Sequence, residues 1–594
     1  MKPSNSISPQ GYQLINIFVG ILLIIFSLSI DVVRPELIPE FRNTKIILIL
    51  IGAFVTLISI VPRRLLLSTR VIYINISKLL LSKTNHLMVI FYQYYMIEIM
   101  CALLIGGLFL RNSLVFDYPI GYAGMYSLAT QLLVNNNLII PSSIPFYGPG
   151  GIPFAYPPVG FYIAALTIKY LHLPIFAYLR FGPPFWTFLA IVAMYFLSKK
   201  ITGSRAISLL ASFFFGSAFE TYYYHVTAAG MVRGPALFFT IVALIGAYKI
   251  FKAGKSTWLD YLITGLFTAL TCLTHLSYFL FLVISIGMFA IFVSRNNYFY
   301  TLKKLLILAI LVALLSAPWL FHVVSVNGFE ILSGAASTHG TFYNLWRFFS
   351  SESGIAISSI FSNWGSIPLI GFVLLGILHL IGTKRFFLPL WFFVTFLVIG
   401  ESDRFMLLIG SLMAAIMIID LMAPSVHSEQ ILFAESIPRQ VVLGIFLIGF
   451  IWANSYVTIA SMRPSVDGAL EDVSDWLNSN TDEQVSYLFF SSDHNRAEWL
   501  PFLAQRNPVF GHWGSEWLGA GKYEYFEWNH ISSCIDSISI ECVRAALSQK
   551  DRNYEYIVLP APQNSGYNPF EDDSNYVLRY SNGKYFVYKV KHAQ

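Results

Sequence analysis

Long apolar runs constrain this chain more than any other feature of its sequence. Thirteen of them approach the length that a helix needs to cross a bilayer, about 20 residues. Every backbone N–H and C=O group in the hydrocarbon has to be paired within its own segment, which favours helices. The composition agrees, since 56% of the residues are hydrophobic and only 12% are charged. We therefore predict a polytopic α-helical membrane protein with about 13 transmembrane helices, at residues 12–30, 44–61, 88–110, 176–198, 204–221, 233–251, 258–277, 278–294, 303–322, 362–381, 386–400, 404–422 and 441–460.

Basic residues indicate the sidedness of these spans, and the interpretation depends on the apolar segment 156–173. If this segment lies along the membrane surface, 18 lysines and arginines fall on one side and nine on the other before residue 461. Short cytoplasmic loops carry the excess of positive charge in membrane proteins. A full span at 156–173 would instead place the basic clusters at 199–205, 249–255 and 295–304 outside. We therefore expect this segment not to span, the N-terminus to be cytoplasmic and the C-terminus extracytoplasmic.

The composition changes after residue 460, where apolar runs shorten and polar residues become frequent. DVSDWLNSN and CVRAALSQ predict helices, and VSYLFF, YEYIVLP and KYFVYKV predict strands. We expect a soluble extracytoplasmic α/β or α+β domain at 461–594. It follows a hairpin with a basic cytoplasmic segment at 1–87 and a transmembrane core at 88–460. In an exported domain, Cys534 and Cys542 suit a disulfide, with two unpaired core thiols as the alternative.

The sequence lacks the motifs of several other function classes. It contains no GxxxxGK[ST] phosphate loop, no GxGxxG after a strand, no HExxH and no paired CxxC. The net charge of +6 follows from the bias of the cytoplasmic loops and gives no case for nucleic acid. No metal site is predicted; a divalent cation is compatible with the sequence but not indicated by it. Ionisable residues at the membrane edges then indicate function best, because charge is costly there.

The outer segment 111–160 places one carboxylate, Asp117, directly after a predicted span. A carboxylate at such an edge is suited to accept a proton from a substrate. Beyond it, apolar residues at helical spacing predict an amphipathic helix over 119–134. Asp117 is equally suited to cap that helix, with Pro119 near its first turn. On the residues alone, both interpretations stay open.

Several features of this segment occur in a recognisable order. Asp117 is followed by the pair Tyr122-Ala123, by LLVNNNLIIP ending at Pro141, and by Tyr156-Pro157-Pro158. This order resembles the first outer loop of the GT-C membrane glycosyltransferases, especially the protein O-mannosyltransferase and aminoarabinose transferase group. The resemblance covers roughly 88–460. It implies surface helices within the outer loop 111–175, and it aligns Asp117 with the family's catalytic acidic residue.

The same resemblance implies an activity and a location. The protein is expected to move a sugar from a polyprenyl-phosphate donor to an acceptor glycan, lipid or protein. The reaction is expected on the outer face of a membrane, which we expect to be the plasma membrane of a prokaryote. The protein is expected to contact membrane lipids. Two other classes stay open: a transporter or flippase of lipid-linked glycans, and a catalytically inactive GT-C-like protein with a binding role.

Later outer loops hold the other residues to which the resemblance gives roles. The family's second acidic residue precedes the span at 233–251, where this chain has Arg233 instead. Glu220 is the only carboxylate of that loop, so either it substitutes or Asp117 acts alone. Arg233 and Arg404 are suited to hold phosphate, because a guanidinium binds two of its oxygens at once. Snorkelling of Arg233 at a helix end and a local salt bridge of Arg404 are the alternatives.

Three further residues complete the predicted substrate-binding set. Tyr122 belongs to the Tyr-Ala pair of the first loop, and His225 shares a loop with Glu220 and Arg233. His275 sits at a tight outer turn, where the family often has a basic residue. His225 is suited to lie between donor and acceptor, and His275 to lie beside a phosphate. A structural, hydrogen-bonded role is the alternative for both histidines.

Overall fold

The computed structural model describes residues 84–591 apart from several gaps, which fall at 148–150, 253–255, 295–297, 333–366, 400–401, 423–448, 450, 512–513, 519–524, 537–538, 549–552, 562–567, 569 and 572. The predicted spans 12–30 and 44–61 lie outside the described residues. The chain forms two compact units. One consists of Met1–Val115 with Ile418–Ala460, and the other of Phe116–Met417 with Ser461–Gln594.

The described part of the first unit contains two apolar helical segments that pack together. They are α4 (Thr84–Val115) and the helical residues 451–460. The Trp452 indole N–H donates to the carbonyl of Leu104 over 3.1 Å, and the Asn112 amide donates to the carbonyl of Ile459 over 3.0 Å. Polar side chains therefore join two segments that lie far apart in the sequence.

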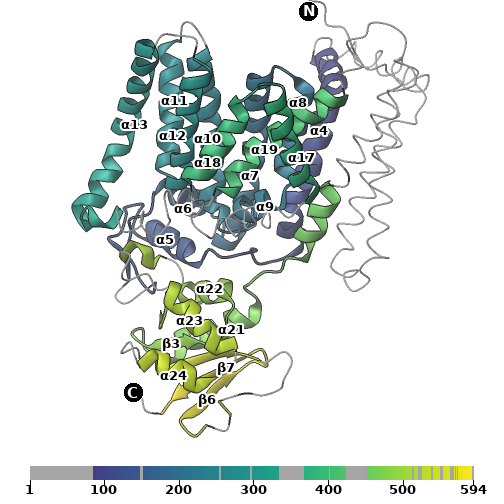
Figure 1. The fold of residues 1–594 in the computed structure, drawn as a ribbon. Coiled ribbons are helices and arrows are strands. Elements are labelled where there is room, and N and C mark those ends of the chain that lie inside the picture. The colour runs from purple at the N-terminus through teal and green to yellow at the C-terminus, as the bar shows by residue number, and fades with distance from the viewer. Residues whose placement is uncertain are drawn as a thin grey trace, which may run out of the picture. The chain divides into compact units, whose positions relative to one another are not determined.

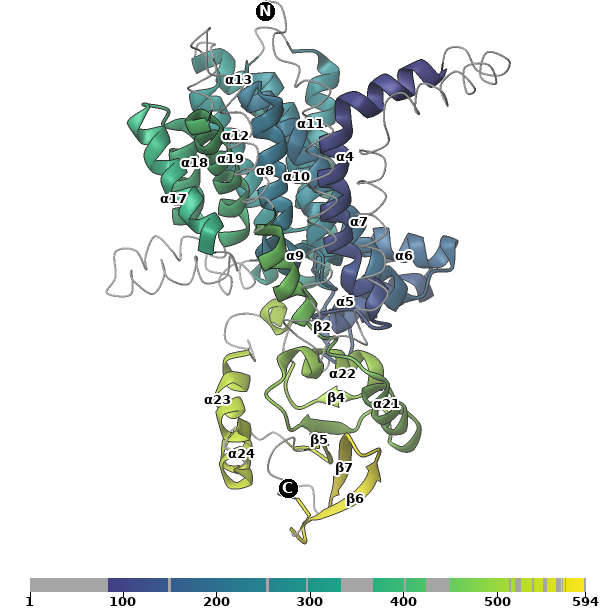
Figure 2. The same cartoon turned by 90° about the vertical axis from the view of Figure 1, so that its right-hand side faces the viewer.

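Nine described helices of the second unit coincide with the spans predicted between 176 and 422. They are α7 (Ile175–Thr202), α8 (Arg205–Ser217), α10 (Gly230–Lys252), α11 (Trp258–Cys272), α12 (Leu276–Phe292), α13 (Tyr298–Asn327), α17 (Ile367–Gly382), α18 (Phe387–Val398) and most of α19 (Asp403–Met422). Helices α10 to α13 lie side by side (Figure 1), and α17, α18 and α19 lie together (Figure 2). Across both units, four described helices are long and apolar enough to cross a membrane: α4 from Glu98 onward, α7, α10 and α13. The count of thirteen spans stays a prediction.

Basic side chains gather at one end of the bundle. Lys249, near the end of α10, forms a 2.7 Å salt bridge with Asp260 in the first turn of α11. Lys304, near the start of α13, donates to the carbonyl of Ile250 over 2.6 Å. Arg233, in the first turns of α10, is therefore at the opposite end of that helix. This separation agrees with the loop charges, while the orientation of the two ends in a membrane stays a prediction.

Residues 116–171, still called the outer segment after their predicted position, form short elements at the end of the bundle that holds Arg233. They are α5 (Gly124–Asn135), the small antiparallel pair β1 (Ser143–Ile144) and β2 (Ile152–Pro153), and α6 (Val159–Leu171). Helix α6 packs on α5, α7 and α10, and the Val159 N–H donates to the carbonyl of Leu273 at the end of α11. Its 13 residues extend about 20 Å. Helix α5 begins later than the predicted 119–134, and a seven-residue helix, α9 (Phe219–His225), precedes α10.

Residues 461–594 contain a mixed five-stranded sheet with strand order β4-β3-β5-β7-β6. Strand β3 is parallel to β4 and β5, and β7 is antiparallel to β5 and β6. The elements are α21 (Gly468–Asn480), β3 (Ser486–Phe489), α22 (His494–Ala504), β4 (Asn507–Pro508), the short helix η3 (Ser515–Leu518), α23 (Tyr525–Asp536), α24 (Ile540–Ser548), β5 (Tyr556–Pro560), β6 (Tyr576–Ser581) and β7 (Tyr585–Val590). The helices at DVSDWLNSN and CVRAALSQ and the three predicted strands are thus present.

Alternate residues of the sheet enter two different cores, as the two-residue period of a strand requires. Val558 packs with α21 and α22 in a core that also contains side chains of α5 and α6. Its neighbours Ile557 and Leu559 pack with α23 and α24 instead. One face of the sheet is therefore connected, through α22, to the outer segment beside the bundle. The domain boundary predicted at residue 461 stays a prediction.

The predicted pair Cys534 and Cys542 forms a disulfide between α23 and α24, with Cα atoms 5.6 Å apart. A bridge across eight residues is expected to stabilise the fold by about 2.5 kcal/mol through loop entropy. We therefore expect the variant with serine at both positions to unfold at a lower temperature in a thermal melt. Reductant should lower the melting temperature of the wild type and leave that of the variant unchanged. An equal effect of reductant on both proteins would contradict this account.

Candidate functional site

Two arginines meet at one tyrosine ring at the end of the bundle opposite Lys249. The Arg233 guanidinium carbon lies 5.3 Å from the centre of the Tyr224 ring, and that of Arg404 lies 5.0 Å from it. Arg233 comes from α10, Arg404 from the start of α19 and Tyr224 from α9. Aromatic faces attract cations, so Tyr224 offsets part of the repulsion between the two guanidinium groups. The fold thus brings together two arginines that are 171 positions apart in the sequence.

Further aromatic rings surround each guanidinium. Arg404 is 3% exposed and also lies over Tyr278 and Phe405, at 5.4 and 5.2 Å. Arg233 lies over Tyr122 at 5.8 Å and donates to its hydroxyl oxygen over 2.7 Å. Tyr122 therefore connects the outer segment directly to this cluster. The predicted residues Tyr122, Arg233 and Arg404 are brought together.

His225 lies against the same cluster as a neutral, hydrogen-bonded side chain. Its Nδ1 is 3.1 Å from the carbonyl oxygen of Thr221, which can only accept, so Nδ1 carries the proton. Its Nε2 then accepts from the Tyr278 hydroxyl over 2.5 Å. Burial lowers the pKa of His225 to about 3, and the charges of Arg404 and Arg233 add to that effect. His225 consequently fixes Tyr278 and adds no positive charge to the site.

His275 and Tyr156 extend the aromatic surroundings toward the outer segment. His275 is the N-cap residue of α12, and its ring centre lies 5.0 Å from that of Tyr278 and 6.3 Å from that of Tyr156. Tyr156 contacts the Trp517 ring at 5.7 Å and shares a hydrogen bond of 3.0 Å with the Tyr126 hydroxyl. The Tyr-Pro-Pro part of the first loop is thereby attached to the same end of the bundle.

The two predicted acidic residues occupy different environments. Glu220 is 1% exposed in the first turn of α9, one turn before Tyr224 and on the same face of that helix. The Asp117 side chain is 98% exposed, and its carboxylate lies 4.0 Å from the guanidinium of Arg180. Arg180 also donates to the Asp117 backbone carbonyl over 3.1 Å. The described contacts of Asp117 are thus with Arg180 of α7, a residue that the sequence did not single out.

One interpretation of Asp117 is wrong. The helix it was expected to cap begins at Gly124 with Ala123 as N-cap residue, too far along the chain for the Asp117 side chain to cap it. The carboxylate that accepts from the first N–H groups of α5 belongs to Glu498 of α22. The prediction from the sequence also did not include Tyr224 or Tyr278 in the site. The run of three tyrosines before His225 was the available signal for Tyr224.

Glu498 binds α5 through both carboxylate oxygens. Oε2 accepts from the Gly124 N–H over 2.6 Å and Oε1 from the Met125 N–H over 2.7 Å. Burial raises the pKa of Glu498 to about 7 despite these hydrogen bonds, which act to lower it. Its carboxylate is thus costly to ionise in this place, although the helix dipole favours a negative charge at the N-terminus of α5.

This raised pKa predicts a pH dependence of stability. Between pH 4.5, the ordinary pKa of the group, and about 7, the folded protein binds more protons at Glu498 than the unfolded chain does. The contribution of Glu498 is therefore complete below 4.5 and is lost as the pH rises through about 7, by up to about 3 kcal/mol. We expect the difference in melting temperature between the wild type and Glu498→Gln to change across this window. A constant difference would contradict the raised pKa.

Within the described ranges, no group of three or more His, Cys, Asp and Glu side chains is arranged to hold a metal ion. The groups that converge are instead cations and aromatic rings. Two partly or fully buried guanidinium groups facing one cluster of tyrosines are suited to bind an anion with several oxygens, such as a phosphate.

Comparisons with known proteins give a fold but no family. No family model and no curated protein matches the sequence. Among solved structures, the oligosaccharyltransferase AglB of Archaeoglobus fulgidus, in complex with an inhibitory peptide and a dolichol-phosphate, aligns with 79% of this chain and 69% of its own, with a TM-score of 0.52 and 14% identity. Its apo form gives a TM-score of 0.53 over 79% of this chain and 70% of its own, also with 14% identity.

A second similar protein is the arabinofuranosyltransferase AftD from Mycobacteria. The structure of a point mutant of this enzyme aligns with 84% of this chain and 42% of its own, with a TM-score of 0.50 and 13% identity. These proteins are GT-C glycosyltransferases. The chain therefore has the GT-C fold, and the expectation drawn from its first outer loop is confirmed at the level of the fold.

Proposed function

We propose that this protein is a glycosyltransferase that moves a sugar from a polyprenyl-phosphate donor to an acceptor at the outer face of the membrane. The observation that carries the proposal is the convergence of Arg233 and Arg404 on Tyr224. The fold supports the proposal, because AglB has a similar fold and its structure has been solved with a dolichol-phosphate. A lipid phosphate needs compensation for its negative charge beside a membrane, and two guanidinium groups supply it.

In the proposed reaction, the two arginines act on the leaving group. An acceptor oxygen or nitrogen attacks the anomeric carbon of the sugar, and the bond from that carbon to the phosphate oxygen breaks. The electron pair stays on this oxygen, so negative charge develops on the phosphate. Arg233 and Arg404 stabilise that charge, and a fixed cationic environment lowers the barrier most where charge appears in the transition state. A single displacement inverts the configuration at the anomeric carbon.

Asp117 is the proposed base for the acceptor. Its exposed carboxylate is open to an acceptor that arrives from water, and it takes the proton as the new bond forms. Arg180 holds the Asp117 backbone and thereby restricts where the carboxylate can lie. Glu220, buried one turn before Tyr224, stays the candidate for the family's second acidic residue. His275 is proposed to line the donor site through its contact with Tyr278.

Binding of a lipid phosphate tests this proposal without knowledge of the sugar. The protein is reconstituted in nanodiscs with undecaprenyl phosphate or with undecaprenol, and bound lipid is counted by native mass spectrometry. We expect retention of the phosphate and not of the alcohol. Equal retention of both lipids would contradict a phosphate site at Arg233 and Arg404.

A further inference from the structure

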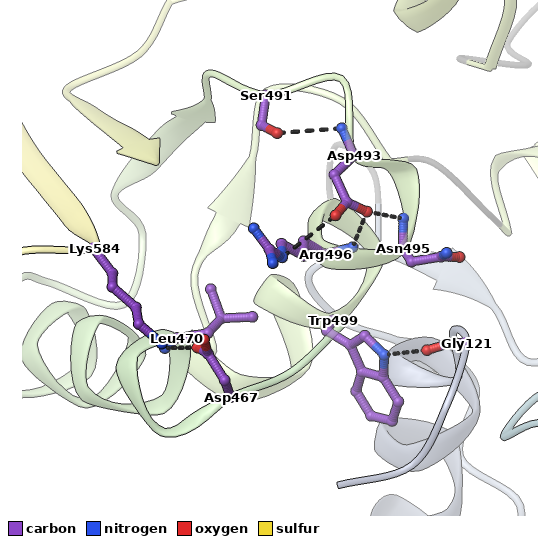
Figure 3. A network of polar contacts seen from close by, with 9 residues as sticks. All are labelled: Gly121, Asp467, Leu470, Ser491, Asp493, Asn495, Arg496, Trp499 and Lys584. Atoms are coloured by element: carbon purple, nitrogen blue, oxygen red, sulfur yellow. Dashed lines mark hydrogen bonds and ion pairs between the residues drawn. The ribbon is translucent and has the colours of Figure 1, made fainter. Parts of the chain in front are cut away.

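The outer segment around Tyr122 is attached to residues 461–594 at several points. The Tyr118 hydroxyl donates to Glu471 of α21 over 2.6 Å. The Trp499 indole N–H of α22 donates to the carbonyl of Gly121 over 2.8 Å (Figure 3). Glu498 accepts from the backbone of Gly124 and Met125, as described above. Tyr122 thus lies between two backbone positions that neighbouring residues of α22 hold.

The conformation of this segment requires glycine at both positions. Gly121 has a φ of +84°, a left-handed conformation that side chains disfavour. At Gly124 a Cβ atom would lie 2.4 Å from the carbonyl oxygen of Glu498 and 2.9 Å from the Cα of Trp499. Both of these are backbone atoms, so a larger residue would push α22 away from the segment. The glycine at position 124 therefore allows α22 to approach the outer segment closely.

Helix α22 is itself firmly held. The Asp493 side chain caps it by accepting from the N–H groups of Asn495 and Arg496, each over 3.1 Å (Figure 3). Trp499 is 0% exposed and packs edge-on against Phe176 at the start of α7, with ring centres 5.7 Å apart. A capped helix with a buried tryptophan gives the outer segment a rigid support.

We propose that Glu498 and Trp499 are positioning residues that hold Tyr122 against Arg233, so that residues 461–594 help to form the phosphate site. This inference rests on the proposed function. The Tyr122 hydroxyl accepts a hydrogen bond from Arg233, and the Arg233 guanidinium carbon lies over the Tyr122 ring. The position of Tyr122 therefore determines where that guanidinium points. Phosphate affinity then depends on a hydrogen bond that is made 377 positions away from Tyr122 in the sequence.

A double-mutant cycle on full-length protein tests this inference. Trp499→Phe removes the indole donor and keeps an aromatic ring, and the affinity for undecaprenyl phosphate is expected to fall about 3- to 10-fold. In a Tyr122→Phe background, the same substitution should change the affinity less than twofold, because the two residues act through one contact. Trp452→Phe is the matched control. It also removes one indole hydrogen bond to a backbone carbonyl, that of Leu104, but neither residue belongs to α22 or to the segment around Tyr122, so affinity should not change.

Hydrogen exchange of residues 118–135 provides a readout that does not depend on the lipid. Trp499→Phe should speed exchange there and Trp452→Phe should not. Gly124→Ala places a Cβ atom against the backbone of α22 and should push that helix away. It should therefore reproduce the lower affinity and the faster exchange of Trp499→Phe. Unchanged exchange, or an equal loss of affinity in both Tyr122 backgrounds, would overturn the inference. If the wild type binds no lipid phosphate, the proposed function fails, and exchange alone then decides whether α22 holds this segment.

Discussion

Replacing Arg404 with glutamine is expected to weaken the binding of undecaprenyl phosphate by about 10- to 100-fold and to slow sugar transfer by about 100- to 1000-fold. Arg404 is almost fully buried among Tyr224, Tyr278 and Phe405, so no mobile surface cation can take its place. Transfer should suffer more than binding, because charge on the phosphate increases when the sugar leaves. Affinity is measured in nanodiscs, and transfer with a labelled donor.

Two further variants separate a phosphate ligand from a structural cation. Arg404→Lys keeps the charge but loses the planar group that binds two oxygens, so its effect should be intermediate. Arg544→Gln is the matched control. Arg544 also lies over a tyrosine, 5.2 Å from the centre of the Tyr576 ring, but it belongs to α24, beside the sheet of residues 461–594. It should leave affinity unchanged. An equal loss in Arg404→Gln and Arg544→Gln, with equal melting temperatures, would contradict the assignment.

Replacing Asp117 with asparagine is expected to slow transfer by about 100- to 10,000-fold and to leave lipid phosphate affinity unchanged. The change removes the proton acceptor and keeps the size of the side chain. Its carboxylate is 98% exposed, so the fold should lose little stability. Transfer rates at saturating donor, with melting temperatures beside them, check the prediction.

An exposed carboxylate elsewhere controls for surface charge. Asp472 lies exposed on α21, and Asp472→Asn should transfer sugar at the rate of the wild type. Turnover of Asp117→Asn equal to that of the wild type would remove Asp117 from the mechanism. Glu220 would then be the remaining predicted acid, buried in the helix that carries Tyr224.

Apolar length and charge predicted the bundle well, because both act locally along the chain. Each predicted span between 176 and 422 has a helix. The basic residues Lys249 and Lys304 lie at one end of the bundle, and Arg233 lies at the other. The strands at VSYLFF, YEYIVLP and KYFVYKV were equally visible, because strand-forming residues are concentrated there.

The site itself was only partly accessible from the sequence. Arg233 and Arg404 were identified singly, but their convergence on Tyr224 depends on how α9, α10 and α19 pack, which no local spacing encodes. Helix α22 was missed because HNRAEWLPFLA mixes polar and apolar residues and contains a proline. Glu498 in particular resembles a solvent-exposed residue in the sequence. Its burial follows from its bonds to the backbone of α5, which lies 374 positions earlier.

Transfer of label from a polyprenyl-phosphate sugar tests the central claim most directly. Proteoliposomes containing the wild type, Arg404→Gln or Asp117→Asn receive donors that carry a radiolabelled sugar, together with a cell-envelope extract as the source of acceptors. The account predicts that the wild type releases polyprenyl phosphate and places the label on an acceptor, and that both variants are at least about 100-fold slower. Donor that crosses the bilayer with its sugar still attached, and no labelled acceptor, would contradict the account and identify a transporter.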